Sequence, residues 1–471
     1  MDSASGKEKA KFVVILGDGM SDFPVKELGG KTPLQAARKP NMDFIARHGE
    51  IGLAKTVPDG VPPGSDTANL AVMGFDPQAL YTGRSPIEAV SMGVKLGESD
   101  VAFRCNLVTL SGGDSAYEER TMLDHSSDEI STEEAAELIG DVNVWLGGLG
   151  LWQEAGAGQG AGVVQGAGAP DAIKFYAGIS YRHCMVWGGR GLGVRCSPPH
   201  DILDRRIADS LPRAADAAGG SAQDDARVLN MVMRESYGFL SSHPVNLARA
   251  ARGMNKANSL WLWGQGTRLA LPSFVDKYGK TGAVVSAVDL LKGIGISAGL
   301  ESIDVPGATG TIDTNYEGKA AAAVDALLRG RDFAYVHVEA PDECGHRSDI
   351  EGKVRAIELL DSRLVGPILQ ALDKHFSVYS VMLLPDHPTP LSLRTHTHDP
   401  VPFAIYRKGA GGASASPGAS ASPGASASPD ASASAGSGVG AASYDEAEAG
   451  RSGLYIDPGH KLMDRFLSLK L

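Results

Sequence analysis

Three short apolar segments of this chain are each followed, two residues later, by an aspartate. They are FVVIL (residues 12–16) before Asp18, FAYVHVEA (333–340) before Asp342 and SVYSVMLL (377–384) before Asp386. Their β-branched and aromatic residues are typical of strands buried in a parallel sheet. In such sheets ligands bind just beyond the carboxyl ends of the strands. We therefore predict a sheet with three aspartates at its ligand-binding edge.

Helical patterns alternate with these strands, as in residues 353–370, where apolar residues recur at i, i+3 and i+4. This alternation predicts an α/β fold with a mostly parallel sheet flanked by helices. The stretch from 101 to 255 differs, because strand-like FRCNLVTL and IKFYAGISYRHCMVWGG are mixed with helix-like STEEAAELI and DARVLNMVMRESYGFL. We predict a catalytic core of residues 1–100 and 256–471, with an α+β domain of residues 101–255 inserted into it.

Two low-complexity segments interrupt these patterns. Residues 154–170 are rich in Gly and Ala, and residues 409–442 repeat GASASP. Such composition cannot bury an apolar core and is typical of flexible surface loops. We expect both segments to carry no chemistry.

The charge and the cysteines narrow the class of protein. The formal net charge is -12, which argues against binding to nucleic acid or anionic membranes. The four cysteines are scattered without a CxxC pair, so neither a disulfide framework nor a structural zinc site is expected. The first residues contain no apolar signal segment, and no run of 18 apolar residues occurs. We expect a cytoplasmic protein.

The last third of the chain is rich in candidate metal ligands. Asp342 and His346 are four residues apart, which places them on one face of a helix. His387 directly follows Asp386, and His396 and His398 lie two apart in an extended segment. Each motif alone is common, and an aspartate after a strand is often a helix N-cap. Together they predict a two-metal site, and carboxylates with imidazoles suit Zn²⁺, Mn²⁺ or a related ion.

Ser65, in PPGSDTANLAVM, directly precedes an apolar stretch that predicts a helix over residues 66–74. Its hydroxyl could cap that helix, and the free N–H groups there also favour a phosphate. A hydroxyl needs a base or a metal to become a nucleophile. Because the sequence is not G-x-S-x-G, it does not indicate a nucleophile elbow. We therefore predict a metal-activated hydroxyl that accepts a phosphoryl group.

Substrate oxygens would need cationic partners. The candidates are Arg84, Arg104, Arg182 with His183, and Lys353. For each of them a salt bridge unconnected with substrate is the alternative role. GIGISA (293–298) matches G-x-G-x-x-A but follows a helical pattern, so a dinucleotide site is not expected, and no P-loop motif occurs.

Motifs along nearly the whole chain, apart from the low-complexity segments, resemble one enzyme family. They are GDGMSD, PGSDTANLAVMGFDP, YTGRSPIEA, FYAGISYRH, CSPPHDIL, SHPVNLARA, ANSLWLWGQG, GAVVSAVDLLKGIGI, VPGATGTIDTNYEGKA, YVHVEAPDECGHRSD and LLPDHPTPLSLRTHTHDPVPFAIY. They are similar to the archaeal-type branch of the cofactor-independent phosphoglycerate mutases, in the alkaline phosphatase superfamily. The resemblance implies an alkaline-phosphatase-like core that interconverts 3-phosphoglycerate and 2-phosphoglycerate through a phosphoserine, with two divalent ions (Mn, Mg or Zn) and without 2,3-bisphosphoglycerate.

The resemblance also assigns roles to individual residues. Ser65 would be the nucleophile and would share one metal with Asp18, Asp386 and His387. The other metal would be held by Asp342, His346 and His396, with His398 as the alternative for the last ligand. Asp66 would relay a proton or contact substrate, and Arg104, Arg182 and His183 would bind substrate from the inserted domain. That domain would act as a lid that excludes water.

Alternatives remain open at the level of the sequence, of which an interaction hub built on the GASASP repeat has only composition in its favour. The same core could serve a metal-dependent phosphatase or another phosphotransferase, which differs in where the phosphoryl group goes after Ser65. A catalytically inactive metal-binding or scaffold protein is a second alternative, against which the retention of Ser65 and six candidate ligands argues.

Overall fold

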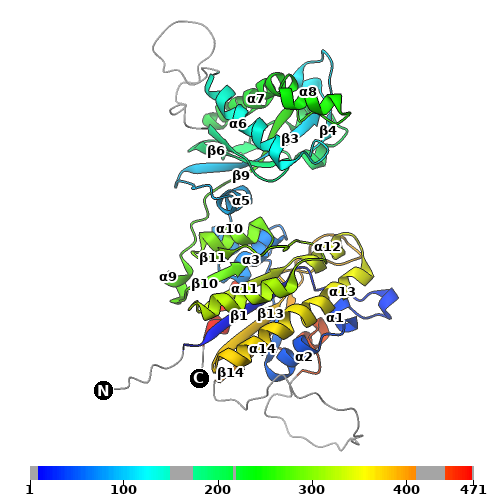
Figure 1. Cartoon of the computed structure of the whole chain (residues 1–471), viewed down its shortest axis with the longest axis vertical. Helices are drawn as coiled ribbons and strands as arrows, with labels where there is room; N and C mark the ends of the chain where they lie inside the picture. The colour runs from blue at the N-terminus through cyan, green and yellow to red at the C-terminus, as the bar shows by residue number, and fades with distance from the viewer. Residues whose placement is uncertain (1–8, 149–172, 216–218, 410–440, 469–471) are drawn as a thin grey trace, which may run out of the picture. The chain divides into compact units, whose positions relative to one another are not determined.

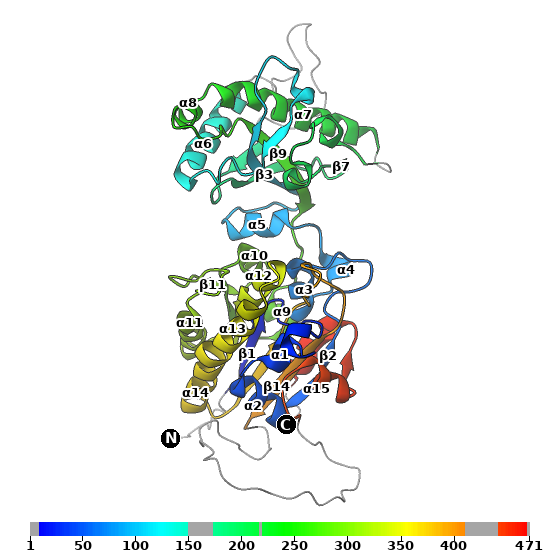
Figure 2. The ribbon, with the colours of Figure 1, turned by 90° about the vertical axis from the view of Figure 1, so that its right-hand side faces the viewer.

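The computed structural model describes residues 9–148, 173–215, 219–409 and 441–468. The chain forms two compact units, which Figures 1 and 2 show in two views. The core unit consists of Met1–Tyr81 and Leu271–Leu471, and the inserted unit is Thr82–Ala270. Compared with the expected insertion at 101–255, the inserted unit also includes helix α5 (Ser85–Ser91) and strand β9 (Ser259–Thr267). Residues 154–170 and 410–440 of the low-complexity segments lie outside the described residues.

The core unit is built on an eight-stranded sheet with the order β11-β10-β12-β1-β13-β14-β2-β15. Its strands are β1 (Lys11–Gly17), β2 (Glu50–Ala54), β10 (Gly282–Val285), β11 (Glu301–Ile303), β12 (Phe333–Val338), β13 (Tyr379–Leu384), β14 (Val401–Lys408) and β15 (Tyr455–Ile456). The five strands from β11 to β13 run parallel, whereas β14 is antiparallel to both of its neighbours. This confirms the predicted α/β fold with a mostly parallel sheet.

Helices cover the sheet, and Figure 1 shows α11, α13 and α14 lying across one face. The helices of the core unit are α1 (Pro33–Ala36), α2 (Pro40–His48), α3 (Ser65–Val72), α4 (Pro77–Leu80), α9 (Phe274–Tyr278), α10 (Asp289–Ser297), α11 (Tyr316–Leu328), α12 (Ala340–His346), α13 (Ile350–Leu360), α14 (Gly366–His375), α15 (Glu446–Arg451) and α16 (Leu462–Leu467). Val13 and Ile15 of β1 belong to the apolar core under α11, α13 and α14. The alternate residue Phe12 packs edge-on against Phe466 of α16, so β1 is buried on both faces.

The position of β1 explains why the three aspartates meet. β1 lies between β12 and β13, with Gly17 opposite Val338 and Leu16 opposite Leu384. All three strands are parallel, so their carboxyl ends lie side by side at one edge of the sheet. The residues that follow them, among them Asp18 and Asp386, are therefore brought to the same place.

The inserted unit has its own antiparallel sheet and apolar core. Its elements are α5, β3 (Asp100–Leu110), β4 (Met122–Asp124), α6 (Thr132–Gly148), β5 (Ile173–Tyr176), β6 (Arg182–Gly188), β7 (Val194–Arg195), β8 (Arg213–Ala214), α7 (Gly220–Ser241), α8 (Pro244–Ala251) and β9. β3 pairs with β6 on one side and with β9 on the other, and residues of α6 and α7 complete the core. The α+β character predicted for this region matches these elements.

Two local features bear on other expectations. GIGISA falls within and just after α10, so these glycines do not form a phosphate-binding loop between a strand and a helix. In the part of the chain that the structure describes, no helix has both the length and the apolar character needed to cross a membrane.

Candidate active site

The predicted metal ligands gather in two clusters within the core unit. The Asp18 cluster comprises Asp18, Asp386 and His387, and the Asp342 cluster comprises Asp342, His346 and His396. Within each cluster, one candidate ligand atom from each residue lies within 4.8 Å of the others. The rings of His387 and His396 are 4.0 Å apart between centroids, so the two clusters adjoin.

The Asp18 cluster is almost completely buried. His387 Nε2 lies 3.5 Å from Asp18 Oδ1 and 3.4 Å from Asp386 Oδ2. Among the described residues none forms a hydrogen bond with Asp18 Oδ1, although this oxygen is buried. An unpartnered carboxylate oxygen in an apolar interior is costly. The carboxylates of Asp18 and Asp386 and the imidazole of His387 lie close together here, and this set of donors fits a divalent cation.

The electrostatics of Asp18 lead to the same conclusion. Burial, and after it the nearby carboxylates of Asp386 and Asp342, raises the pKa of Asp18 well above its usual value. Burial also lowers the pKa of the His387 imidazole, which favours its neutral form. A crowded group of buried carboxylates beside a neutral imidazole favours any cation that enters, because the ion offsets their mutual repulsion.

The Asp342 cluster forms because α12 places Asp342 and His346 one turn apart on the same face. His346 Nε2 lies 3.2 Å from Asp342 Oδ2, and His396 Nε2 lies 3.4 Å from Asp342 Oδ1. The two imidazole Nε2 atoms are 3.0 Å from each other. Two imidazole nitrogens and two carboxylate oxygens that point at one another form a typical donor set for a transition-metal ion.

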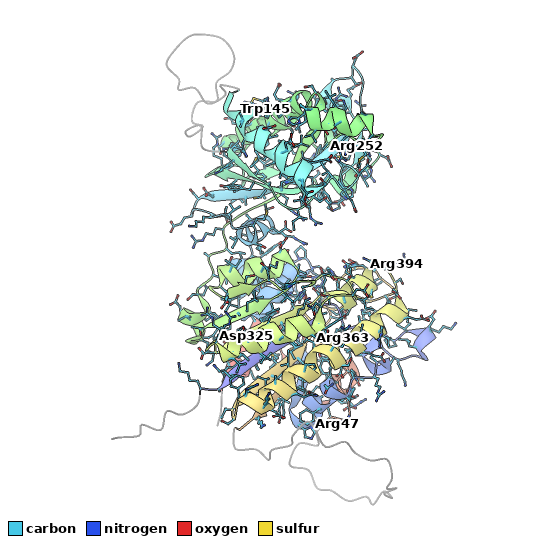
Figure 3. The ribbon with its side chains drawn as sticks, viewed as in Figure 1. Arg47, Trp145, Arg252, Asp325, Arg363 and Arg394 are labelled. Atoms are coloured by element: carbon cyan, nitrogen blue, oxygen red, sulfur yellow. The ribbon has the colours of Figure 1, made fainter. Side chains whose placement is uncertain are left out.

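In the Asp342 cluster, Asp342 and His346 stabilise each other's charged forms. The hydrogen bond with Asp342 raises the pKa of His346 to about 9. Burial alone would raise the pKa of Asp342, but the imidazoles of His346 and His396 hold it well below its usual value. The outer nitrogen of His346, Nδ1, is 3.0 Å from the carbonyl oxygen of Arg394, which Figure 3 labels near α12. This contact orients the His346 ring so that Nε2 faces the cluster.

The structure brings His396 rather than His398 into the cluster. His398 Nε2 lies instead 2.8 Å from the carbonyl oxygen of Val61, and its side chain is exposed. The sequence left a choice between these two histidines, because residues two apart in an extended segment share a face.

Ser65 is the first residue of α3, and the N-cap is Gly64, which corrects the capping role considered for the Ser65 hydroxyl. Ser65 Oγ instead lies 3.2 Å from His387 Nε2, beside the Asp18 cluster. Asn69, one turn later, donates from Nδ2 both to the Ser65 carbonyl oxygen and to Asp386 Oδ2, each at 2.8 Å. Asn69 therefore connects the start of α3 to Asp386 of the Asp18 cluster.

Asp66 points to a different partner. Its Oδ2 accepts a hydrogen bond of 2.5 Å from the hydroxyl of Tyr81, and its Oδ1 accepts one of 2.9 Å from the Thr67 amide. These two hydrogen bonds hold the carboxylate of Asp66, the residue after Ser65, in one orientation.

Sequence reasoning missed His337, Asn69 and Thr389. His337 Nε2 lies 2.9 Å from Asp18 Oδ2, and its Nδ1 lies 3.1 Å from Ser286 Oγ. Burial lowers the pKa of His337 to about 3, so the ring is neutral. The available signal was a single histidine inside the otherwise apolar strand FAYVHV. The polar groups packed around it could not be read from its neighbours in sequence.

The arginines predicted to bind substrate lie in the inserted unit. Glu88 joins two of them, with Oε2 at 2.9 Å from Arg104 Nε and Oε1 at 2.7 Å from Arg84 Nε. The Arg104 guanidinium also lies 4.2 Å from the centre of the Trp263 ring. Burial, opposed by Glu88 and reinforced by the charges of Arg84 and Arg182, lowers the pKa of Arg104. Three guanidiniums thus lie close enough to influence one another.

His183 and Lys353 differ from these exposed or half-buried cations. His183 is buried, its Nδ1 accepts from the Gly178 amide at 3.1 Å, and burial lowers its pKa to about 3. The role of Lys353 as a substrate contact is corrected, because its Nζ is buried and bonded to Asp22 Oδ2 at 2.7 Å and to the Thr389 carbonyl oxygen at 2.8 Å.

Comparisons with known proteins show the family to which the chain belongs. The sequence profile of the 2,3-bisphosphoglycerate-independent phosphoglycerate mutase family matches residues 46–246. A probable 2,3-bisphosphoglycerate-independent phosphoglycerate mutase of Geobacter sulfurreducens is 47% identical over 457 residues, covering 97% of this chain and 99% of that protein. The corresponding mutase of Methanosarcina acetivorans is 49% identical over 401 residues, covering 85% of this chain and 91% of that protein.

Solved structures show the same fold. A protein from Pyrococcus horikoshii matches with a TM-score of 0.70 and 27% identity, over 98% of this chain and 97% of its own. The cofactor-independent phosphoglycerate mutase from Thermoplasma acidophilum matches with a TM-score of 0.60 and 24% identity, over 98% and 99% of the two chains. Sequence identity of nearly one half over almost the full length shows that the chain belongs to the archaeal-type branch of the 2,3-bisphosphoglycerate-independent phosphoglycerate mutase family.

Proposed function

We propose that this protein interconverts 3-phosphoglycerate and 2-phosphoglycerate without 2,3-bisphosphoglycerate, using Ser65 as the nucleophile. The observation that carries the proposal is the 3.2 Å distance between Ser65 Oγ and His387 Nε2. It puts the hydroxyl beside a buried group of carboxylates and imidazoles whose donor set suits a divalent ion. Membership of the mutase family supports the proposed reaction, and this contact supports Ser65 as its nucleophile.

The two clusters suit two divalent ions: Asp18, Asp386 and His387, with Ser65 beside them, would hold one, and Asp342, His346 and His396 would hold the other. When bound, such ions lower the pKa of a coordinated hydroxyl and offset negative charge on phosphoryl oxygens. Asn69 contributes from the protein side, because its bonds to Ser65 O and Asp386 Oδ2 keep the hydroxyl next to the cluster.

In the first half of the reaction a bond forms between Ser65 Oγ and phosphorus while the bond from phosphorus to the substrate oxygen breaks. Ser65 gives up its proton, and the released substrate oxygen takes one. Asp66 is suited to carry this proton, because the Tyr81 hydroxyl holds its carboxylate in place. The second half repeats these steps in reverse on the other hydroxyl of the bound glycerate.

A mutase must keep the glycerate bound after the first half of the reaction until the second half begins. Arg104 and Arg182 are proposed to bind its carboxylate, since guanidiniums bind such groups through paired hydrogen bonds. His183 is proposed to act only as a neutral group there, because its ring is buried and unprotonated at neutral pH. The inserted unit is proposed to serve as a lid that keeps water from the phosphoserine.

The test is an assay of wild type and Ser65→Ala with 3-phosphoglycerate, in which enolase converts the 2-phosphoglycerate formed. It is run without 2,3-bisphosphoglycerate, and with Mn²⁺ or with a chelator. Ser362→Ala is a matched control, because Ser362 is exposed and its hydroxyl donates to the Glu358 carbonyl oxygen one turn earlier.

We expect metal-dependent activity in wild type and Ser362→Ala, and loss of it in Ser65→Ala. Release of inorganic phosphate by wild type without 2-phosphoglycerate would favour the metal-dependent phosphatase instead. Unchanged activity in Ser65→Ala would remove Ser65 from the mechanism, and inactivity of wild type with every divalent ion would favour the scaffold alternative.

A further inference from the structure

We propose that Thr389 is a positioning residue whose single hydroxyl couples the two candidate metal clusters. The inference rests on the two-metal site of the proposed function. Thr389 Oγ1 donates a hydrogen bond to Asp342 Oδ1 of one cluster and lies 3.3 Å from His387 Nδ1 of the other. The Thr389 side chain is completely buried, so no water competes for these contacts.

The direction of the two hydrogen bonds follows from the chemistry of the three groups. In the structure the Thr389 hydroxyl is the donor and Asp342 Oδ1 the acceptor, and a hydroxyl carries a single proton. The one proton of the Thr389 hydroxyl is therefore used toward Asp342. Toward His387 the hydroxyl oxygen can then only accept, so a hydrogen bond across the 3.3 Å between the two atoms requires a proton on His387 Nδ1.

The proton on Nδ1 determines which nitrogen His387 presents to the Asp18 cluster. With its proton on Nδ1, His387 presents an unprotonated Nε2, and Nε2 is the atom that faces Asp18 Oδ1 and Ser65 Oγ. A histidine binds a metal through an unprotonated nitrogen, and the hydrogen bond on its other nitrogen selects that form. Thr389 therefore selects the form of His387 that can bind one metal, and it holds the carboxylate of Asp342, a candidate ligand of the other, in place.

The surroundings of Thr389 leave it little freedom. Its carbonyl oxygen accepts from the buried ammonium of Lys353 at 2.8 Å. A Cβ at Gly345 of α12 would come 2.6 Å from that same carbonyl oxygen, and a Cβ at Gly19 would come 2.6 Å from Thr389 Oγ1. Glycine at both positions is thus what allows the helix of Asp342 and the loop of Asp18 to close on Thr389.

The inference predicts that removing the hydroxyl weakens both metal sites together. Thr389→Val keeps the shape of the side chain and loses the hydroxyl, whereas Thr389→Ser keeps the hydroxyl. Thr389→Ala is a second variant without the hydroxyl, for use if the valine variant does not fold. Thr311→Val is the matched control, because Thr311 is an exposed threonine of the core unit.

The experiment titrates Mn²⁺ into chelator-treated full-length protein by calorimetry. We expect Thr389→Val and Thr389→Ala to bind both ions roughly 10- to 100-fold more weakly, as for other groups that orient metal ligands. Thr389→Ser should stay close to wild type. A ¹⁵N spectrum of histidine-labelled protein, with the His387 signals assigned through His387→Asn, should show the Nδ1-protonated form in wild type and a loss of that preference in Thr389→Val.

Two outcomes would overturn the inference. One is wild-type affinity at both sites in Thr389→Val, and the other is weakening at the Asp342 cluster alone, which would leave the clusters uncoupled. Both differ from a failure of the two-metal site itself, in which wild-type protein would bind fewer than two ions.

Discussion

The imidazole of His337 lies 2.9 Å from the carboxylate of Asp18, and this contact crosses from β12 to the end of β1. The other ring nitrogen of His337 is 3.1 Å from Ser286 Oγ, just after β10. The two contacts of His337 thus link three neighbouring strands, β10, β12 and β1, next to Asp18. Because His337 is neutral, it acts by orienting Asp18 through a hydrogen bond and adds no charge of its own.

We predict that His337→Leu weakens divalent-metal binding at the Asp18 cluster by about 10- to 100-fold, the usual effect of losing a partner of a metal ligand. Asp18 Oδ2 would then lose its hydrogen bond with His337, and Oδ1 has no hydrogen-bond partner among the described residues. Calorimetric titration with Mn²⁺ measures the change, and His375→Gln, an exposed histidine at the end of α14, is the control. Wild-type affinity in a folded His337→Leu variant would assign His337 to packing alone.

The Asp342 cluster is expected to bind metal more tightly as the pH rises from 7 toward 9. The pKa of His346 in the metal-free protein is about 9, so its imidazole is protonated below that pH. An entering cation must displace this proton, and the competition disappears as the pH rises above the pKa. Titrations in buffers of different ionisation enthalpy should detect close to one proton released from His346 per ion at pH 7. Metal affinity that stays constant over this range would contradict the assignment.

Glu88 is expected to act on substrate affinity through the two arginines it holds. In Glu88→Gln one carboxylate oxygen is replaced by an NH2 group, which cannot accept from the guanidinium of Arg84 or Arg104 that it faces. Loss of one charge-assisted hydrogen bond amounts to about 1.5 kcal/mol, so we expect KM for 3-phosphoglycerate to rise roughly tenfold with a smaller change in kcat. Glu119→Gln, which breaks the exposed pair with Arg206, is the control. A fall in kcat alone would place Glu88 outside substrate binding.

Lys353 is expected to be important for stability. Its ammonium and the Asp22 carboxylate form a buried ion pair with almost no exposed side-chain surface. Lys353→Met leaves Asp22 charged and unpaired, which should lower the free energy of unfolding by about 3–5 kcal/mol. The double variant Lys353→Met with Asp22→Asn should recover part of that loss. Urea unfolding measures both, and a single variant as stable as wild type would show that Asp22 finds another partner.

The candidate metal ligands that lie close together in the chain could be predicted from the sequence. The spacing of Asp342 and His346 determines a shared helix face, and Asp386 with His387 follows a strand whose apolar character marks it as buried. Local periodicity suffices here because both pairs lie within single elements or at their ends. The choice between His396 and His398 lay beyond it, since it depends on where the loop passes Val61 and Pro63.

The sequence by itself determined the strands, the aspartates at their ends and, through its motifs, the family to which the chain belongs. The tertiary structure decided which side chains complete the clusters. Asn69, His337 and Thr389 lie in a helix, a strand and a loop, and each bonds to a residue more than 40 positions away or to one on another element. Such contacts depend on strand order and on the close approach of α12 at Gly345, and neither leaves a pattern in the local sequence.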